Sequence, residues 1–301
     1  MTALVRHSAR RHKPERMDTP FDRRLRRIRR DRAAPRFAQA DYLHRHATEE
    51  LLHRLDFVTR PFADALVLGC PDRSLSDALS ARGLAVATAD PGFLFARARE
   101  GVQCDEDRLP FADRSFDLVV CVGLLDSVND LPGALTLMRR TLRPDGLFLA
   151  AFAGAGSLPR LRAAMLAADE AQGGAAPRIH PQIDVRAAGD LLTRAGFALP
   201  VADVEPLDIR YSGLSSLLSD LRAMGATNML AGQHRAPLSR LGYAAALAEF
   251  ASAADPDGKT VERFDIIHLS GWAPAPDQPR AARRGSATAS LADALRPKPP
   301  A

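Results

Sequence analysis

The stretch LPFADRSFDLVVCVGLL, at residues 109–125, decides the fold of this chain. Its second part, 116–125, is almost entirely apolar, which is typical of a strand buried on both faces of a parallel sheet. A second apolar run, LFLAAF at 147–152, follows a helical pattern at 131–142. A strand, a crossover helix and a second strand of this kind predict a βαβ unit and an α/β fold.

The same alternation of strand and helix patterns continues on both sides of this unit. Leu43, Ala47, Leu51 and Leu55 recur at four-residue spacing, which predicts an amphipathic helix within 37–58. We therefore expect a Rossmann-like sheet with helices on both faces. Its further strands are expected at 65–70, 85–89, 197–204 and 261–269, and its further helices at 74–82, 158–171, 185–195, 214–224 and 238–254.

The net charge of +5 over 301 residues is unevenly distributed. Residues 1–36 hold 13 Lys or Arg against 4 Asp or Glu, whereas residues 37–274 hold 23 against 30. The body is thus acidic, which disfavours a generic nucleic-acid-binding domain with a basic surface on its body. We expect a basic, flexible arm at 1–36, a single domain at 37–274 with a helical insertion near 205–255, and a Pro- and Arg-containing tail at 275–301.

Cysteine usage and hydropathy exclude several further classes of protein. The three cysteines show no C-x-x-C spacing, which argues against a disulfide framework or a metal site and favours a reducing compartment. The longest apolar runs are shorter than the ~20 residues of a membrane span, and no secretory signal follows the basic start. We expect residues 1–16 to be disordered or to precede a true start at Met17.

Three groups of residues follow the ends of predicted parallel strands, where ligands bind in open α/β sheets. The first is the turn Gly69-Cys70, and the second is Asp90, whose carboxylate could accept both ribose hydroxyls of a nucleoside. The third is the pair Asp105-Glu106, where a carboxylate could receive an adenine amino group. Each signal alone is weak, because Asp also caps helices and a Gly-Cys pair also makes plain turns. Together, their order and spacing predict a nucleoside site.

The stretches 109–125 and 139–152 resemble the central motifs of class I S-adenosylmethionine (SAM)-dependent methyltransferases. A wider match, from about residue 21 to residue 295, resembles the methyltransferase-like mitochondrial complex I assembly factor 5 family and its proteobacterial relatives. It rests on FDRRLRRIRRDRAA (21–34), VNDLPGAL (128–135), DVRAAGDLLTRAGFALPVAD (184–203), LLSDLRAMGATN (217–228), LSGWAP (269–274) and GSATASLADAL (285–295).

This resemblance implies a seven-stranded, mostly parallel sheet whose last strand, at 261–269, is reversed. It also implies SAM as the cofactor and a protein substrate, because the mitochondrial members are linked to hydroxylation of an arginine on a complex I subunit. The cofactor-binding residues that it implies are Gly69, Cys70, Asp90, Asp105, Glu106 and Leu124.

The chain departs from the family pattern in the first loop and at residues 126–127, where the cofactor and the substrate are expected to bind. In the first loop, Val67 replaces an acid, and Pro71 and Arg73 replace glycines. Pro71 fixes φ and removes an N–H donor, and Arg73 adds bulk, so we expect SAM binding to be weak or lost. The family's His-Trp is Asp126-Ser127 here, and no catalytic residue can be named.

Two classes of function therefore stay open. One is a SAM-dependent methyltransferase or a related protein-arginine hydroxylase, and the other is a non-catalytic assembly factor with a degenerate SAM site. We expect a bacterial cytoplasmic protein, or one held at the inner membrane surface by its basic arm. That arm should contact an acidic partner or a membrane and read no nucleic-acid sequence. We expect Asp126 to be a solvated loop acid and His180 a surface residue.

Overall fold

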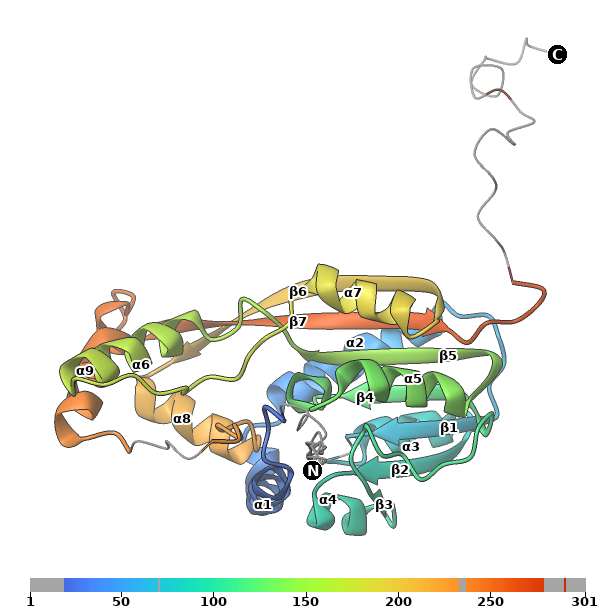
Figure 1. The fold of residues 1–301 in the computed structure, drawn as a ribbon, viewed down its shortest axis with the longest axis horizontal. Helices are drawn as coiled ribbons and strands as arrows, with labels where there is room; N and C mark the ends of the chain where they lie inside the picture. The colour runs from blue at the N-terminus through green and yellow to red at the C-terminus, as the bar shows by residue number, and fades with distance from the viewer. Residues whose placement is uncertain (1–18, 70, 233–236, 279–289, 291–301) are drawn as a thin grey trace, which may run out of the picture.

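A single seven-stranded sheet organises the chain (Figure 1). The computed structural model describes residues 19–69, 71–232, 237–278 and Ser290. The strand order is β3-β2-β1-β4-β5-β7-β6. The strands are β1 (Asp64–Leu68), β2 (Ala85–Asp90), β3 (Val102–Gln103), β4 (Phe116–Val122), β5 (Leu142–Ala153), β6 (Ala198–Tyr211) and β7 (Thr260–Trp272).

The first five strands run parallel, and β7 is reversed. It lies between β5 and β6 and pairs antiparallel with both. This arrangement confirms the seven-stranded Rossmann-like fold with a reversed last strand. Parallel strands place their carboxyl ends at one edge, so β1, β2 and β4 present their following loops side by side.

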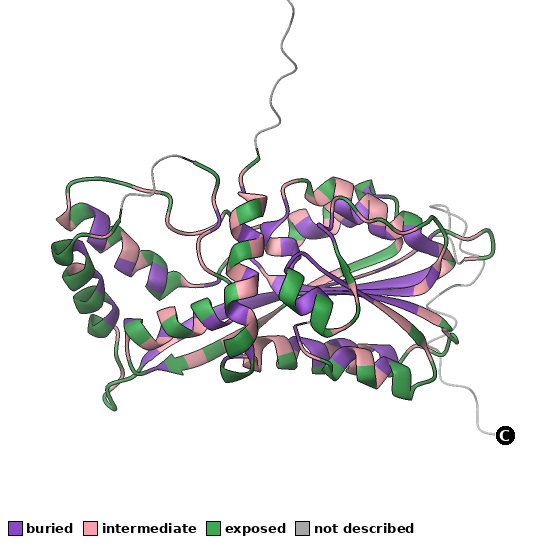
Figure 2. Ribbon diagram, turned by 90° about the horizontal axis from the view of Figure 1, so that it is seen from below, coloured by how far each residue is buried: buried purple, intermediate pink, exposed green. Residues whose placement is uncertain are grey.

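Two helical layers cover the sheet, and side chains alternate between them along each strand. On β1, Val67 packs into the core below α2 (Tyr42–Asp56) and α3 (Ser74–Ala81), whereas Leu66 and Leu68 pack into the opposite core. That second core lies below α5 (Leu131–Thr141) and α7 (Val185–Arg194). Figure 2 shows the buried residues concentrated along the strands between these layers.

A helical lobe sits at one end of the sheet (Figure 1). Its helices are α6 (Pro159–Ala171), α8 (Leu214–Ala223) and α9 (Arg240–Ser252). The insertion expected near 205–255 is corrected in one respect, because 205–211 continue strand β6. Twelve aligned residue pairs join β6 to β7, so the lobe is built on a long antiparallel ribbon.

The basic segment before the domain is folded where the structure describes it. Residues 23–33 form helix α1 (Arg23–Ala33), and a 3₁₀ turn, η1 (Ala34–Gln39), joins it to α2. The expectation of a flexible arm is thus wrong for 23–36, because body acids neutralise the arginines whose mutual repulsion underlay it. Residues 1–18, which include Met17, and most of the tail lie outside the described residues.

The remaining elements of the described residues are α4 (Phe93–Ala98) beside β2, η2 (Leu125–Ser127) after β4, and two isolated bridges, one between Phe21 and Leu230 and one between Ala254 and Thr260. None of the helices in the described ranges is long and apolar enough to cross a membrane.

Candidate functional site

The turn after β1 approaches the end of β4 very closely. Gly69 adopts a positive φ of 77°, and its N–H donates a hydrogen bond of 3.0 Å to the carbonyl of Ala89 on β2. A Cβ placed on Gly69 would lie 2.2 Å from the Val122 carbonyl oxygen. Both the dihedral angle and the contact require glycine here, so this turn keeps the close backbone approach of a ligand-binding loop.

The rest of that turn differs from a glycine-rich loop. Pro71 is buried, and its carbonyl accepts a hydrogen bond of 3.2 Å from Arg99. Arg73 is exposed at the start of α3, where its side chain meets solvent. Cys70 lies outside the described residues. The departure that bears on a ligand is therefore the N–H donor that Pro71 lacks.

Asp90 lies at the carboxyl end of β2 with only 1% of its surface exposed. Its two oxygens accept hydrogen bonds from Arg30 of helix α1, at 2.8 Å from Nε and 2.6 Å from Nη2. The N–H of Gly92 donates a third bond of 2.7 Å. The Arg30 guanidinium also lies over the Phe95 ring, 5.0 Å from its centroid. A bidentate pair of this kind fixes the carboxylate and its orientation.

Asp105 and Glu106 are also buried and paired with α1. Arg26 makes a bidentate contact with Glu106, at 2.7 and 2.9 Å. Burial acts to lower the pKa of Arg26, but the contact with Glu106 outweighs it and the pKa is raised. Arg27 and Arg23 reach Asp105 at 2.7 and 3.2 Å, while the Asp105 Oδ1 atom is buried without a hydrogen-bond partner.

Leu124, the last residue implied as cofactor-binding, connects these two regions. Its side chain lies against Gly69, and its carbonyl accepts a hydrogen bond of 3.1 Å from Arg26. Arg26 also donates to the Ser127 hydroxyl at 3.1 Å. The structure thus gathers Gly69, Asp90, Asp105, Glu106 and Leu124 at one edge of the sheet, around the arginines of α1.

Two adjoining cavities open beside this edge. The smaller, of about 120 Å³, lies next to Arg30, Pro71 and Gly123, and the larger, of about 230 Å³, extends toward α6 and α8. They share Leu43, Asp126, Ala153, Met224 and Ala226, and we call them together the chamber. Most of the side chains that line the chamber are apolar.

Two polar residues of the chamber were misjudged from sequence. Asp126 is not a solvated loop acid: it is half-buried and lines both cavities. Burial raises its pKa, against the opposing pull of Arg26 and Arg30. His180 is not an exposed surface residue: it is partly buried and lines the larger cavity, and its Nε2 accepts a hydrogen bond of 2.8 Å from the Met229 N–H. Burial lowers the pKa of His180 to about 4.

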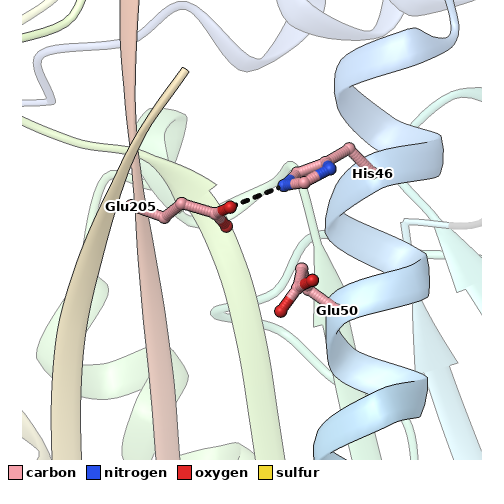
Figure 3. Close-up of side chains that lie close together, drawn as sticks. All are labelled: His46, Glu50 and Glu205. Carbon is pink, nitrogen blue, oxygen red and sulfur yellow. Dashed lines mark hydrogen bonds and ion pairs between the residues drawn. The ribbon is translucent and has the colours of Figure 1, made fainter.

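A separate polar cluster lies between α2 and the β6–β7 ribbon (Figure 3). His46 and Glu205 form a hydrogen bond of 2.9 Å, and His268 reaches the second oxygen of Glu205 at 3.2 Å. Glu50 joins His46 and Glu205 in a group whose ligand atoms lie within 4.8 Å of one another, which is compatible with a cation. The hydrogen bonds already present lock α2 to the ribbon, so we assign the cluster a structural role.

The arginines of α1 are the site residues that sequence reasoning missed. Arg23, Arg26, Arg27 and Arg30 follow the spacing of one helix face, and we call them the arginine face. That spacing was the available signal, but the run was interpreted as a solvated arm.

Comparisons with known proteins agree with this geometry. A family profile described as "Methyltransferase domain" matches residues 66–150. The mitochondrial arginine-hydroxylase NDUFAF5 of Danio rerio is 33% identical over 285 residues, covering 91% of this chain and 88% of that protein. The human protein of that name is 34% identical over 285 residues, covering 91% of this chain and 82% of its own length.

A bacterial relative and a solved structure extend the match. The malonyl-[acyl-carrier protein] O-methyltransferase of Methylovorus sp. (strain MP688) is 32% identical over 262 residues, covering 81% of this chain and 86% of that protein. A crystal structure from Bacillus halodurans, classed as a methyltransferase, superposes with a TM-score of 0.51 at 13% identity, covering 76% of this chain and 99% of that one. The chain therefore belongs to the class I SAM-dependent methyltransferase family, among the relatives of the arginine hydroxylase NDUFAF5.

Proposed function

We propose that this chain is a SAM-dependent methyltransferase that acts on a protein or protein-borne acceptor during assembly of respiratory complex I. The observation that carries the proposal is the row of ligand-binding groups at the carboxyl edge: the Gly69 turn, Asp90 and Asp105 follow three neighbouring strands. The names of the relatives, which describe arginine hydroxylation and O-methylation of a malonyl group on acyl-carrier protein, support it.

The residues at this edge fit SAM in three places. The Asp90 carboxylate has two oxygens for the two ribose hydroxyls, and the Asp105 Oδ1 atom is a buried acceptor for the adenine amino group. The Gly69 turn offers bare backbone to the methionine end. When bound, SAM supplies a methyl group on a sulfonium, which is the electrophile of methyl transfer.

The chamber is the place for the acceptor. It adjoins Pro71 and Gly123 at the strand ends and continues as an apolar cavity toward α8, so it can hold an acceptor while excluding water. Methyl transfer depends mainly on positioning the acceptor in line. Asp126 is the carboxylate common to both cavities, and its raised pKa favours it as the group that takes a proton from the acceptor.

A specific observation favours a second function, that of a non-catalytic assembly factor. Both oxygens of Asp90 already bind Arg30, and Pro71 lacks a donor that a glycine loop would give. A chain that keeps the fold and the partner surface but no longer binds SAM would show these two features. Arginine hydroxylation, the reaction named for the mitochondrial relatives, is the third possibility for the same site.

The outward side of α1 suggests how the chain meets its partner. Arg29, Arg32, Arg36 and Arg222 line a hollow of about 620 Å³ at the junction of α1, η1 and α8. We assign this basic hollow to an acidic protein surface, or to an anionic membrane surface close to it, and to no specific nucleic-acid sequence. The chain would then work in the bacterial cytoplasm, beside the inner membrane.

Calorimetric titration with SAM tests the proposal directly. Pro71→Gly restores one hydrogen-bond donor worth about 1 kcal/mol. Since tenfold in affinity is about 1.4 kcal/mol, the Pro71→Gly/Arg73→Gly variant should bind SAM roughly fivefold more tightly than the wild type. Asp90→Ala in that background should abolish binding.

The matched control is Asp77→Ala, which changes an exposed acid on α3, just after the same loop. If no variant with an intact fold binds SAM, including one in which Arg26 and Arg30 are also replaced, the assembly-factor function replaces the proposed one. If Asp90→Ala binds SAM unchanged, the ligand lies elsewhere on the sheet.

A further inference from the structure

The arginine face of α1 lies on the groups that the fold offers to adenosine. Its spacing places Arg23, Arg26, Arg27 and Arg30 on one side of the helix. Arg30 binds both oxygens of Asp90, and Arg26 binds both oxygens of Glu106. These contacts join residues 60 and 80 positions apart, so they are a tertiary feature of the fold.

The Asp90 carboxylate cannot accept hydrogen bonds from Arg30 and from the ribose of adenosine at the same time. A ribose diol that donates to Asp90 must displace Arg30 Nε and Nη2, which already occupy both oxygens at 2.8 and 2.6 Å. Asp105 accepts from Arg27 through Oδ2, but its Oδ1 atom is buried and lacks a partner. An unsatisfied buried acceptor is costly, and it points to a donor that is absent from this state.

We propose that α1 and SAM are competing occupants of one site, so that SAM binds only to the chain from which the arginine face has withdrawn. This inference rests on the proposed function. In the structure described above, which we call the closed state, guanidinium groups of the chain's own helix α1 occupy the site.

The way α1 is held makes its withdrawal feasible. Its buried residues are Arg26, Arg30 and Ala33, and its contacts are mostly polar. They are the charge pairs with the acids and hydrogen bonds with Leu124, Ser127, Thr227 and Leu94. Burying a charged pair costs desolvation, which offsets much of its attraction. Adenosine can replace the guanidinium on Asp90, so this carboxylate has hydrogen-bond donors in both states.

The two ends of the helix are attached to loops and to η1, and not to strands of the sheet. Its C-terminal end continues into η1, with Pro35 in the first turn, and at its N-terminal side Phe21 is held through Asn129 and Leu230. A ligand that needs a minor open state shows an apparent Kd equal to its intrinsic Kd divided by the open fraction. The closed position of α1 therefore weakens SAM binding even where every protein group that contacts SAM is intact.

The decisive variant removes the charge of two arginines and keeps their apolar stems. In the full chain, Arg26→Met/Arg30→Met should bind SAM at least tenfold more tightly than the wild type in calorimetry. The matched control, Arg24→Met/Arg45→Met, removes two exposed arginines, one from α1 and one from α2, and should leave the Kd unchanged. Asp90→Ala added to the decisive variant should abolish the gain.

Hydrogen exchange supplies a second readout on the unmodified chain. Saturating SAM should increase the exchange of the backbone amides of 23–33 and leave those of α5 unchanged. SAM binding with full protection of α1 would overturn the proposal, whatever the variants do. This measurement also decides the matter if the doubly substituted chain does not fold.

The outcomes separate this inference from the proposed function. If Pro71→Gly/Arg73→Gly gains affinity but Arg26→Met/Arg30→Met does not, SAM binding stands and competition by α1 is wrong. If the folded arginine variant, the loop variant and their combination all leave SAM unbound, both proposals are wrong, and α1 permanently closes a site that no longer serves SAM.

Discussion

Lowering the pH should loosen the chamber wall through His180. Burial lowers the pKa of His180 to about 4, whereas its ordinary value is 6.5. Its Nε2 accepts a hydrogen bond from the Met229 N–H, and its ring meets Phe21 edge-on with centroids 5.1 Å apart. Protonation removes that acceptor, so it opposes the contacts that hold the segment before α1.

The sign of the effect follows from proton uptake in the two states. As pH falls below 6.5, the unfolded chain binds a proton at His180 that the folded chain refuses until about 4. The free energy of unfolding therefore decreases through this window. At 1.36 kcal/mol per unit, the loss attributable to His180 is about 2 kcal/mol between about pH 7.5 and about pH 5.

Urea unfolding at the two pH values, followed by circular dichroism, measures this loss. The control is His180→Gln, whose side-chain oxygen can accept the same hydrogen bond and does not titrate. Its stability should fall by about 2 kcal/mol less than that of the wild type over the same interval. His44 and His268, whose pKa values are also lowered by burial, contribute equally to both proteins. Equal pH dependence of the two proteins would refute the reasoning.

Three further predictions concern stability. Gly69→Ala should destabilise the fold by several kcal/mol, and more than Gly83→Ala, which has a similar positive φ but open space; urea midpoints of the two variants separate the clash from the dihedral cost. Glu262→Ala should cost about 1–3 kcal/mol in the same assay, because this fully buried carboxylate accepts the first N–H groups of α6. A double-mutant cycle of Arg54→Ala and Asp203→Ala should give a coupling below about 1 kcal/mol, since solvent screens this half-exposed pair; a larger value would contradict that account.

Apolar runs made most of the sheet predictable. Strand β4 and the part of β5 from 147 to 153 are continuous apolar segments because both of their faces are buried, and the glycine after β1 marks the end of that strand. The two-residue β3 and the six-residue α4 are too short to leave a periodic pattern, so neither was expected. The second part of β6 shows the alternation of a half-exposed strand at Leu207, Ile209 and Tyr211, but Pro206 breaks its continuity with the first part.

The site was predictable only in part, because the positions of its acids follow from local sequence whereas the contacts of its arginines do not. Asp90 and Asp105 follow strand ends, which local sequence identifies. Their partners, Arg30 and Arg27, lie 60 and 78 residues earlier, and no local pattern reports a charge pair across such a separation. The burial of Asp126 likewise depends on α2 and α8, which close over it from distant parts of the chain.

The β6–β7 ribbon has a mechanical consequence. The same two strands serve as the sheet's outer edge and as the backbone of the helical lobe, and they are cross-linked by hydrogen bonds along their length (Figure 1). A hinge between lobe and sheet would have to bend both strands together, so the two parts behave as one stiff body. The displacement of α1 that we propose is then the movement of a peripheral helix against a frame that itself stays rigid.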